Sequence, residues 1–123
     1  MKILYKKDVL HVDKKEGLSV DYYLFNEYEV HYNEQKPNSI QKWHHHEKIW
    51  ETLFIIEGEM TLHWREGSEV KALQVGPGTL IETEHTSHTF SNNSARVAKF
   101  LVFKQILKDQ NYQDLLKKDK ILD

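Results

Sequence analysis

The sequence contains no cysteine. Disulfide bonds and thiolate metal ligands are therefore excluded, and a bound metal would have to be held by histidine and carboxylate side chains. The chain also lacks any apolar stretch near the roughly 20 residues that a membrane-spanning helix requires. Segment 1–8 carries lysines and an aspartate where a signal peptide would need an apolar region. These absences predict a soluble, cytoplasmic protein.

An excess of positive charge is also missing. Lysine and arginine number 17 against 19 acidic residues, which gives a net charge of -2 with neutral histidine. Basic residues never run longer than a pair of lysines. A surface that binds nucleic acid needs clustered positive charge, so we expect no nucleic-acid partner.

Short segments rich in β-branched and aromatic residues make up most of the chain. Residues 18–32 predict two strands with a break near Asn26, and residues 60–64 and 70–75 predict a hairpin. Strands in short, evenly spaced pieces are typical of an antiparallel sandwich or barrel. With no linker or repeat in 123 residues, we expect one all-β domain over residues 1–123.

The C-terminal segment has a different pattern. Asn111 resembles a helix N-cap, Asp114 follows in the first turn, and lysines lie where a helix dipole favours cations. The residues that would form the apolar side and the basic end are Leu115, Leu116, Lys117, Lys118 and Lys120. This pattern predicts one short C-terminal helix.

Three consecutive histidines lie near the middle of the chain. On an extended strand, His44 and His46 point to one side and His45 points to the other. A hairpin after His46 would bring the carboxylate of Glu51 beside the two imidazoles. Two nitrogens and an oxygen on one surface predict a metal site.

The apolar run from Thr52 to Ile56 follows Glu51 and is typical of a strand that is buried on both faces. Leu53 and Ile55 would share the face of Glu51, and Phe54 and Ile56 would lie opposite. These opposite residues need cover from the N-terminal strands, the C-terminal helix or a second subunit. We expect a homodimer.

The spacing His44-x-His46, four residues, Glu51, six residues, Gly58 resembles the first motif of the cupin superfamily. His88 and Asn92 match the end of its second motif. The resemblance implies a small antiparallel β-barrel, or jelly roll, built from two sheets. It also implies the metal ligands, which are His44, His46, Glu51 and His88.

The chain departs from the cupin pattern at three positions. Asn38 stands where glycine is usual, and Asn also adopts left-handed backbone. Thr83 and His85 replace the usual proline and glycine of the second motif, so that loop must take another shape. His85 could enter the pocket as an extra ligand or a titrating group. Our candidates for proton transfer are Glu51 first and His85 second, whereas His31 is predicted to be a surface residue.

Three imidazoles and one carboxylate suit a divalent transition metal, namely Fe, Mn, Ni, Zn or Cu. Such a site predicts a metal-dependent enzyme, of the dioxygenase or isomerase type, acting on a small oxygen-rich substrate. Two alternatives stay open: a non-catalytic module that binds or senses a sugar or organic acid, and a metal-free structural barrel. The fold that the resemblance implies does not choose among them.

Overall fold

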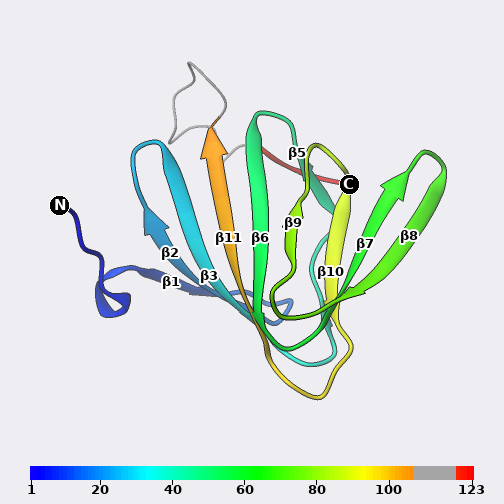
Figure 1. Ribbon diagram of the computed structural model, residues 1–123, viewed down its shortest axis with the longest axis horizontal. Helices are drawn as coiled ribbons and strands as arrows, with labels where there is room; N and C mark the ends of the chain where they lie inside the picture. The colour runs from blue at the N-terminus through cyan, green and yellow to red at the C-terminus, as the bar shows by residue number, and fades with distance from the viewer. Residues whose placement is uncertain (107–118) are drawn as a thin grey trace.

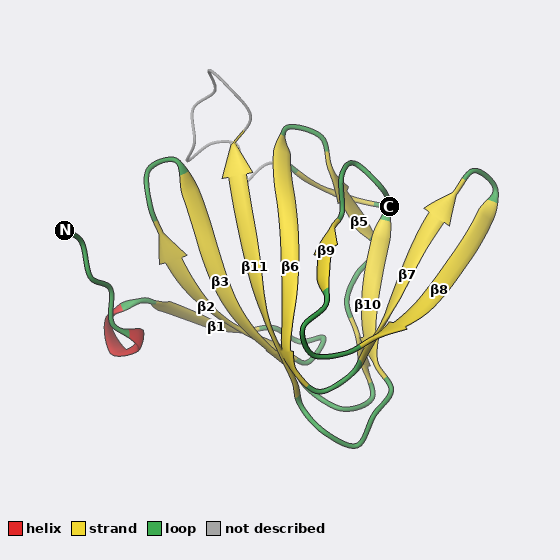
Figure 2. Ribbon diagram, viewed as in Figure 1, coloured by secondary structure: helices red, strands yellow, loops and turns green. Residues whose placement is uncertain are grey.

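The computed structural model describes residues 1–106 and 119–123, which form two antiparallel sheets (Figure 1, Figure 2). The elements in chain order are the 3-10 helix η1 (Lys6–Asp8) and the strands β1 (Leu10–Asp13), β2 (Leu18–Leu24), β3 (Tyr28–Gln35), β4 (Ser39–Ile40), β5 (His44–His46), β6 (Ile49–Glu57), β7 (Met60–Glu66), β8 (Glu69–Val75), β9 (Leu80–Glu82), β10 (His88–Asn92), β11 (Ala98–Ile106) and β12 (Lys120–Leu122). The predicted all-β class, the two strands on either side of Asn26 and the β7–β8 hairpin are confirmed. The structure also pairs β2 with β3.

The first sheet has the strand order β1-β2-β3-β11-β6-β9, and the second has the order β12-β5-β10-β7-β8 with β4 paired to β10. Both sheets follow the jelly-roll-like arrangement that the resemblance implied. Over the described ranges, hydrogen bonding does not join them into a closed barrel. The prediction of two antiparallel sheets is therefore confirmed, and the prediction of closure is not.

Strand β6 shows how the first sheet separates its two faces. Leu53 and Ile55 are buried on the face that carries Glu51, as predicted, while Phe54 is 41% exposed and Ile56 is 43% exposed. The expectation that this strand is buried on both faces is wrong. One face of the sheet packs toward the second sheet, and the other lies at the surface of the chain.

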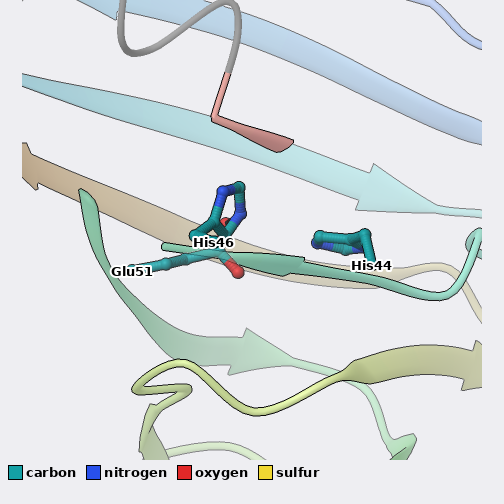
Figure 3. Close-up of side chains that lie close together, drawn as sticks. All are labelled: His44, His46 and Glu51. Atoms are coloured by element: carbon teal, nitrogen blue, oxygen red, sulfur yellow. Dashed lines mark hydrogen bonds and ion pairs between the residues drawn. The ribbon is translucent and has the colours of Figure 1, made fainter. Parts of the chain in front are cut away.

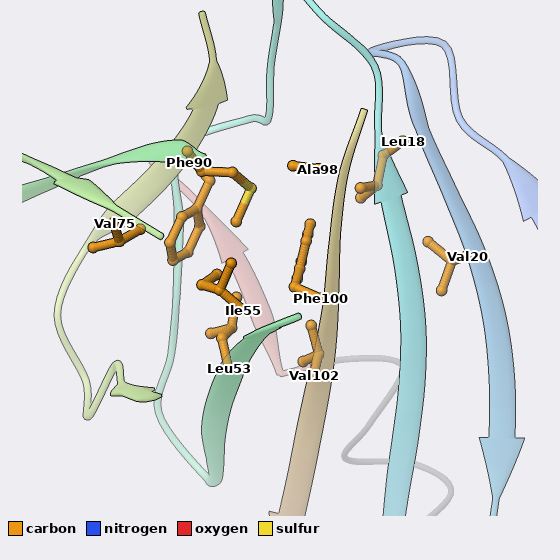
Figure 4. Close-up of a cluster of buried hydrophobic side chains, with 10 residues drawn as sticks. Leu18, Val20, Leu53, Ile55, Val75, Phe90, Ala98, Phe100 and Val102 are labelled. Atoms are coloured by element: carbon orange, nitrogen blue, oxygen red, sulfur yellow. The ribbon is translucent and has the colours of Figure 1, made fainter. Parts of the chain in front are cut away.

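The hydrophobic core lies between the two sheets (Figure 4). Phe90 from the second sheet stacks on Phe100 from the first, with ring centroids 6.4 Å apart. The buried residues of this core are Leu18, Val20, Leu53, Ile55, Met60, Val75, Phe90, Ala98, Phe100 and Val102. Burial of these side chains is the main source of stability for a fold without disulfides.

Strand pairing arranges the inner face of the first sheet in rows that run across β2, β3, β11 and β6. Three successive rows, in that strand order, are Val20–Asn33–Phe100–Ile55, Tyr22–His31–Val102–Leu53 and Leu24–Glu29–Lys104–Glu51. We call them the core row, the middle row and the polar row. Charged side chains appear only in the last of the three, so this face changes from apolar to charged along its length.

The predicted C-terminal helix falls mostly on residues 107–118, which lie outside the described residues. Lys120, which we placed at the basic end of that helix, instead begins strand β12 and pairs with His46. That part of the prediction is wrong because pairing with β5 outweighs the local helix signal. No helix in the described ranges is long and apolar enough to cross a membrane.

Candidate metal centre

Strands β5 and β6 bring the first three predicted ligands together (Figure 3). His44, His46 and Glu51 are 4%, 1% and 5% exposed, and one candidate ligand atom from each lies within 4.8 Å of the others. His45 points to the other side of β5, as the alternation of a strand requires, and its Nδ1 lies 2.8 Å from the carboxylate of Asp123. The structure therefore brings these three predicted residues together, and their role as metal ligands stays a prediction.

The fourth predicted ligand, His88, comes from β10, where it is the pairing partner of His44. Its imidazole is 2% exposed and lies with its ring centroid 4.5 Å from that of His44. His88 Nε2 lies 3.3 Å from Glu51 Oε1, without the alignment of a hydrogen bond. The structure thus brings all four predicted ligands into one buried group.

Backbone carbonyls orient two of the imidazoles. Nδ1 of His44 lies 2.8 Å from the carbonyl oxygen of Lys42, and Nδ1 of His88 lies 2.7 Å from that of Thr86. A carbonyl can only accept, so each Nδ1 carries a proton, and in the neutral form of each imidazole Nε2 presents its lone pair. His88 Nε2 is buried and has no hydrogen-bond partner among the described residues. A buried lone pair fixed in this way is the donor that a metal ion requires.

His46 and Glu51 contact each other directly. Nε2 of His46 donates a hydrogen bond to Oε2 of Glu51 over 2.9 Å. The other ring nitrogen, Nδ1, is buried without a hydrogen-bond partner in the described part of the chain and lies 4.0 Å from Oδ2 of Asp119. A shift of the proton from Nε2 to Nδ1 would free Nε2 and point the N–H toward Asp119. The residues therefore fit a divalent ion.

The protonation states of Glu51 and His44 suit metal binding. Burial alone would raise the pKa of Glu51, but contacts from His46 and His88 and the charge of Lys104 lower it well below its usual value. Burial also lowers the pKa of His44 to about 3. At neutral pH the site therefore holds an ionised carboxylate and a neutral imidazole, the forms that bind a metal.

Asp119 fixes the turn between β5 and β6, a role that sequence reasoning missed. Its Oδ2 accepts hydrogen bonds from the backbone N–H groups of Lys48 and Ile49 over 2.8 Å and 2.9 Å, and a third comes from Glu47. This turn sets the distance between His46 and Glu51. The contact joins residues about 70 positions apart, so no local pattern around Asp119 could have revealed it.

The departures from the cupin pattern have visible structural roles. Asn38 has φ 57°, which confirms that asparagine takes the left-handed backbone in place of glycine. In the second-motif loop, Glu84 also has a positive φ, of 53°. The backbone N–H and the hydroxyl of Thr83 both donate to the carbonyl oxygen of Glu51, over 3.0 Å and 3.2 Å. The altered loop therefore helps to position a candidate ligand.

His85, the second candidate for proton transfer, is exposed. Its Nδ1 lies 2.8 Å from the carbonyl oxygen of His46, and its ring packs edge-on against Trp50. With His45, Arg65 and Asp123 it lines a shallow surface depression and not the central cavity. The structure does not bring His85 to the same space as the other candidates, and its catalytic role stays a prediction.

A central cavity of about 320 Å³ opens beside His44 and Glu51. Its wall includes residues from the three rows of the first sheet. His31 belongs to this wall, is 6% exposed, and lies with Nε2 2.7 Å from Oε1 of Glu29. The prediction that His31 is a surface residue is wrong because the register of β3 turns it inward. Burial lowers its pKa, so His31 stays neutral near neutral pH.

The chain is a two-sheet β-protein with a buried histidine–glutamate cluster at its inner face. Residues 28–104 match the cupin domain family, and this match spans more than half of the chain. The chain belongs to the cupin family. A comparison with curated proteins found no match.

Solved structures share the fold at low sequence identity. A variant of the oxalate decarboxylase of B. subtilis superposes with a TM-score of 0.76 at 15% identity, over 97% of this chain and 31% of that one. CapF, a capsular polysaccharide assembling protein from Staphylococcus aureus, gives 0.73 at 16%, over 93% and 34%. This chain thus spans about a third of those two proteins. The polyketide cyclase RemF from Streptomyces resistomycificus gives 0.69 at 19%, over 90% and 89%.

Proposed function

We propose that this cupin binds one divalent transition metal through His44, His46, Glu51 and His88 and acts as a metal-dependent enzyme on a small, oxygen-bearing substrate. The observation that carries the proposal is the buried Nε2 of His88, which presents a lone pair beside the His44–His46–Glu51 cluster with no hydrogen-bond partner in the described residues. A buried polar atom without a partner is costly in a metal-free protein.

The cavity beside this cluster favours a catalytic metal site, in which substrate can reach the ion, over a structural site that is closed by protein ligands. A structural metal is normally enclosed by protein ligands, whereas His44 and Glu51 also border a space of about 320 Å³. A bound ion would act there as a Lewis acid on a carbonyl or hydroxyl oxygen. The dioxygenase and isomerase types are both compatible with this donor set.

Glu51 is the first candidate for proton transfer because it borders the cavity and contacts two imidazoles. Lys104 lies with Nζ 3.9 Å from Glu51 Oε2 and favours the ionised carboxylate. Glu51 can therefore accept a proton at an Oε atom from a substrate held in the cavity. His85 lies outside this cavity, which supports the order of the two candidates.

The test begins with metal content. Purified chain is reconstituted with Fe(II), Mn(II), Ni(II) or Zn(II), dialysed and measured by elemental analysis, and we expect about one ion per chain. Each loaded form is then incubated with dicarbonyls, flavonols and sugar phosphates, and products are followed by mass spectrometry. Conversion by at least one form supports the enzyme.

The other outcomes separate the alternatives. Ligands that shift the metal spectrum but are never converted favour the module that binds or senses a sugar or organic acid. Failure to retain any metal in all four preparations favours the metal-free barrel and contradicts the proposal.

We also propose that the chain forms a homodimer and is cytoplasmic. The dimer is supported by an apolar patch on the outer face of the first sheet, where Phe54 on β6 pairs with Leu80 on β9, and both are exposed. Ile56 and Phe103 extend the exposed apolar surface on the neighbouring positions. A second copy of the chain could cover this patch.

A further inference from the structure

Three lysines from separate parts of the chain border the central cavity. Lys14 comes from the turn between β1 and β2, Lys104 from the polar row on β11, and Lys120 from the start of β12. Each is at least partly buried, so these are not freely solvated surface lysines. Strand pairing and the C-terminal segment bring their charges to one space.

Two of these lysines lack a counter-ion. Lys104 approaches Glu51, but among the described residues neither Lys14 nor Lys120 forms a side-chain hydrogen bond or ion pair. The cavity wall holds two carboxylates, Glu29 and Glu51. The first is bound to His31, and the second belongs to the candidate metal centre. Among the residues of the cavity wall, positive charge therefore exceeds negative charge even before a divalent ion is added. Glu16 lies outside this wall and acts on Lys14 and Lys120 only by its charge, without an ion pair in the described part of the chain.

This arrangement is unfavourable without a ligand. Burial, together with the charges of Lys14 and Lys104, lowers the pKa of Lys120 to about 8. Burial and the charge of Lys104 likewise lower the pKa of Lys14. Partly buried cations that repel one another are stabilised when an anion lies between them.

We propose that the central cavity binds a small anion, whose carboxylate or phosphate group lies among Lys14, Lys104 and Lys120 while a second oxygen group faces His44 and Glu51. This inference rests on the proposed metal-dependent function and assigns its substrate class. Uncharged sugars and neutral diketones would leave the lysines without a partner. The cavity volume of about 320 Å³ suits a small molecule.

The experiment is calorimetric titration of both the Zn(II)-loaded and the metal-free protein. The probes are malonate, phosphoglycolate and malonamide, which separate a carboxylate, a phosphate and an uncharged analogue of similar size. Malonate also chelates metal better than malonamide does, so the preference between probes cannot decide the matter alone. Lysine variants supply the decisive comparison.

The test variant combines Lys14→Gln and Lys120→Gln, which removes two charges without touching Glu51. We expect malonate or phosphoglycolate to bind the variant at least about tenfold more weakly, because charge-assisted hydrogen bonds are lost. The double variant with Lys14→Arg and Lys120→Arg should retain binding. Lys71→Gln is the matched control, since Lys71 lies on the exposed strand β8. A thermal melt checks folding, and Lys120→Met alone replaces the double variant if that chain does not fold.

Two results overturn the inference: equal anion affinity in the wild type and the lysine variant, or no detectable binding of either anion to either form. Metal content is measured on the same samples, so failure of the metal site is a separate result. If no zinc is retained, lysine-dependent anion binding to the metal-free protein still supports the anion site while the proposed enzyme fails. If zinc is retained and binding ignores the lysines, only the anion site fails.

Discussion

The core row and the polar row lie on one face of one sheet, only two rows apart, yet they meet opposite requirements. The core row packs Phe100 against Phe90 and contributes stability through burial. The polar row holds Glu29, Lys104 and Glu51 beside the cavity, where burial of charge costs free energy unless each group finds a partner. The comparison teaches that the core row stabilises the fold. That stability offsets the free-energy cost of holding the charged groups of the polar row in fixed positions beside the cavity.

Removing two ligands should produce the largest change. In the variant with His44→Ala and His46→Ala, we expect metal content to fall from about one ion per chain to nearly none, because two nitrogen donors are lost. The matched control is His45→Ala, which alters the residue between them but points to the other face. Elemental analysis after reconstitution measures both. Unchanged metal content in the double variant would show that the site assignment is wrong.

Truncating a buried side chain of the core row should have the next largest effect. The change should appear in the free energy of unfolding and not in the metal content. Phe100 is 1% exposed, so Phe100→Ala should lower the free energy of unfolding by about 3–5 kcal/mol. Urea denaturation followed by circular dichroism measures the loss. Phe103→Ala is the control on the same strand, because Phe103 is 39% exposed and should cost much less. Similar losses in the two variants would contradict the assigned burial of the two faces.

Lowering the pH should destabilise the folded, metal-free protein, because the pKa values of His44 and Glu51 are both lowered in it. The pKa of His44 is about 3 in the fold, so the unfolded chain takes up a proton near pH 6.5 that the folded chain cannot. The stability that depends on a neutral His44 is therefore complete above about pH 6.5 and falls as the pH drops toward 3. The lowered pKa of Glu51 adds a loss of the same sign below about pH 4.5.

Urea denaturation of the metal-free protein at a series of pH values measures this slope. The variant His44→Gln should make the part between pH 6.5 and 4.5 less steep than in the wild type, and the slope that remains there comes from the lowered pKa of His31. A free energy of unfolding that is constant from pH 7 to 4, or that rises, would contradict the burial of a neutral His44.

Asp119→Ala should give a smaller loss of stability and a weaker metal site. Three backbone N–H groups lose their acceptor, which should cost about 1–3 kcal/mol. The turn that spaces His46 from Glu51 loosens as well, so metal affinity should fall about 10–100-fold, as for other residues that orient ligands. Competition with a chelator measures affinity. Asp123→Ala, in the same C-terminal segment but beside His45, should leave metal affinity unchanged.

The smallest effect on the folding of one chain is expected at the outer face. Phe54→Lys places a charge on the exposed apolar patch and should change the stability of the monomer by less than about 0.5 kcal/mol. If the patch is the dimer contact, the same change should convert the dimer to a monomer in sedimentation at micromolar concentration. A wild-type mass equal to one chain would contradict the homodimer.

Local spacing accounts for the parts of the site that were predictable. The alternation of His44, His45 and His46 follows from the period of a strand, and Glu51 returns beside them because a short turn follows. The same alternation placed Leu53 and Ile55 on the inner face. His88 was identified by its resemblance to the second cupin motif, and its pairing with His44 brought it to the predicted position.

The sequence by itself determined the all-β class, the two strands on either side of Asn26, the β7–β8 hairpin and the four candidate ligands, because these depend on neighbours within one strand or turn or on a motif. Only the tertiary structure decided that His31 faces the cavity, that Asp119 holds the ligand turn, and that Lys14, Lys104 and Lys120 share one space. These contacts depend on strand order and register between distant segments. No periodicity along the chain encodes which strands become neighbours, so the physical pairing of the sheets had to supply that information.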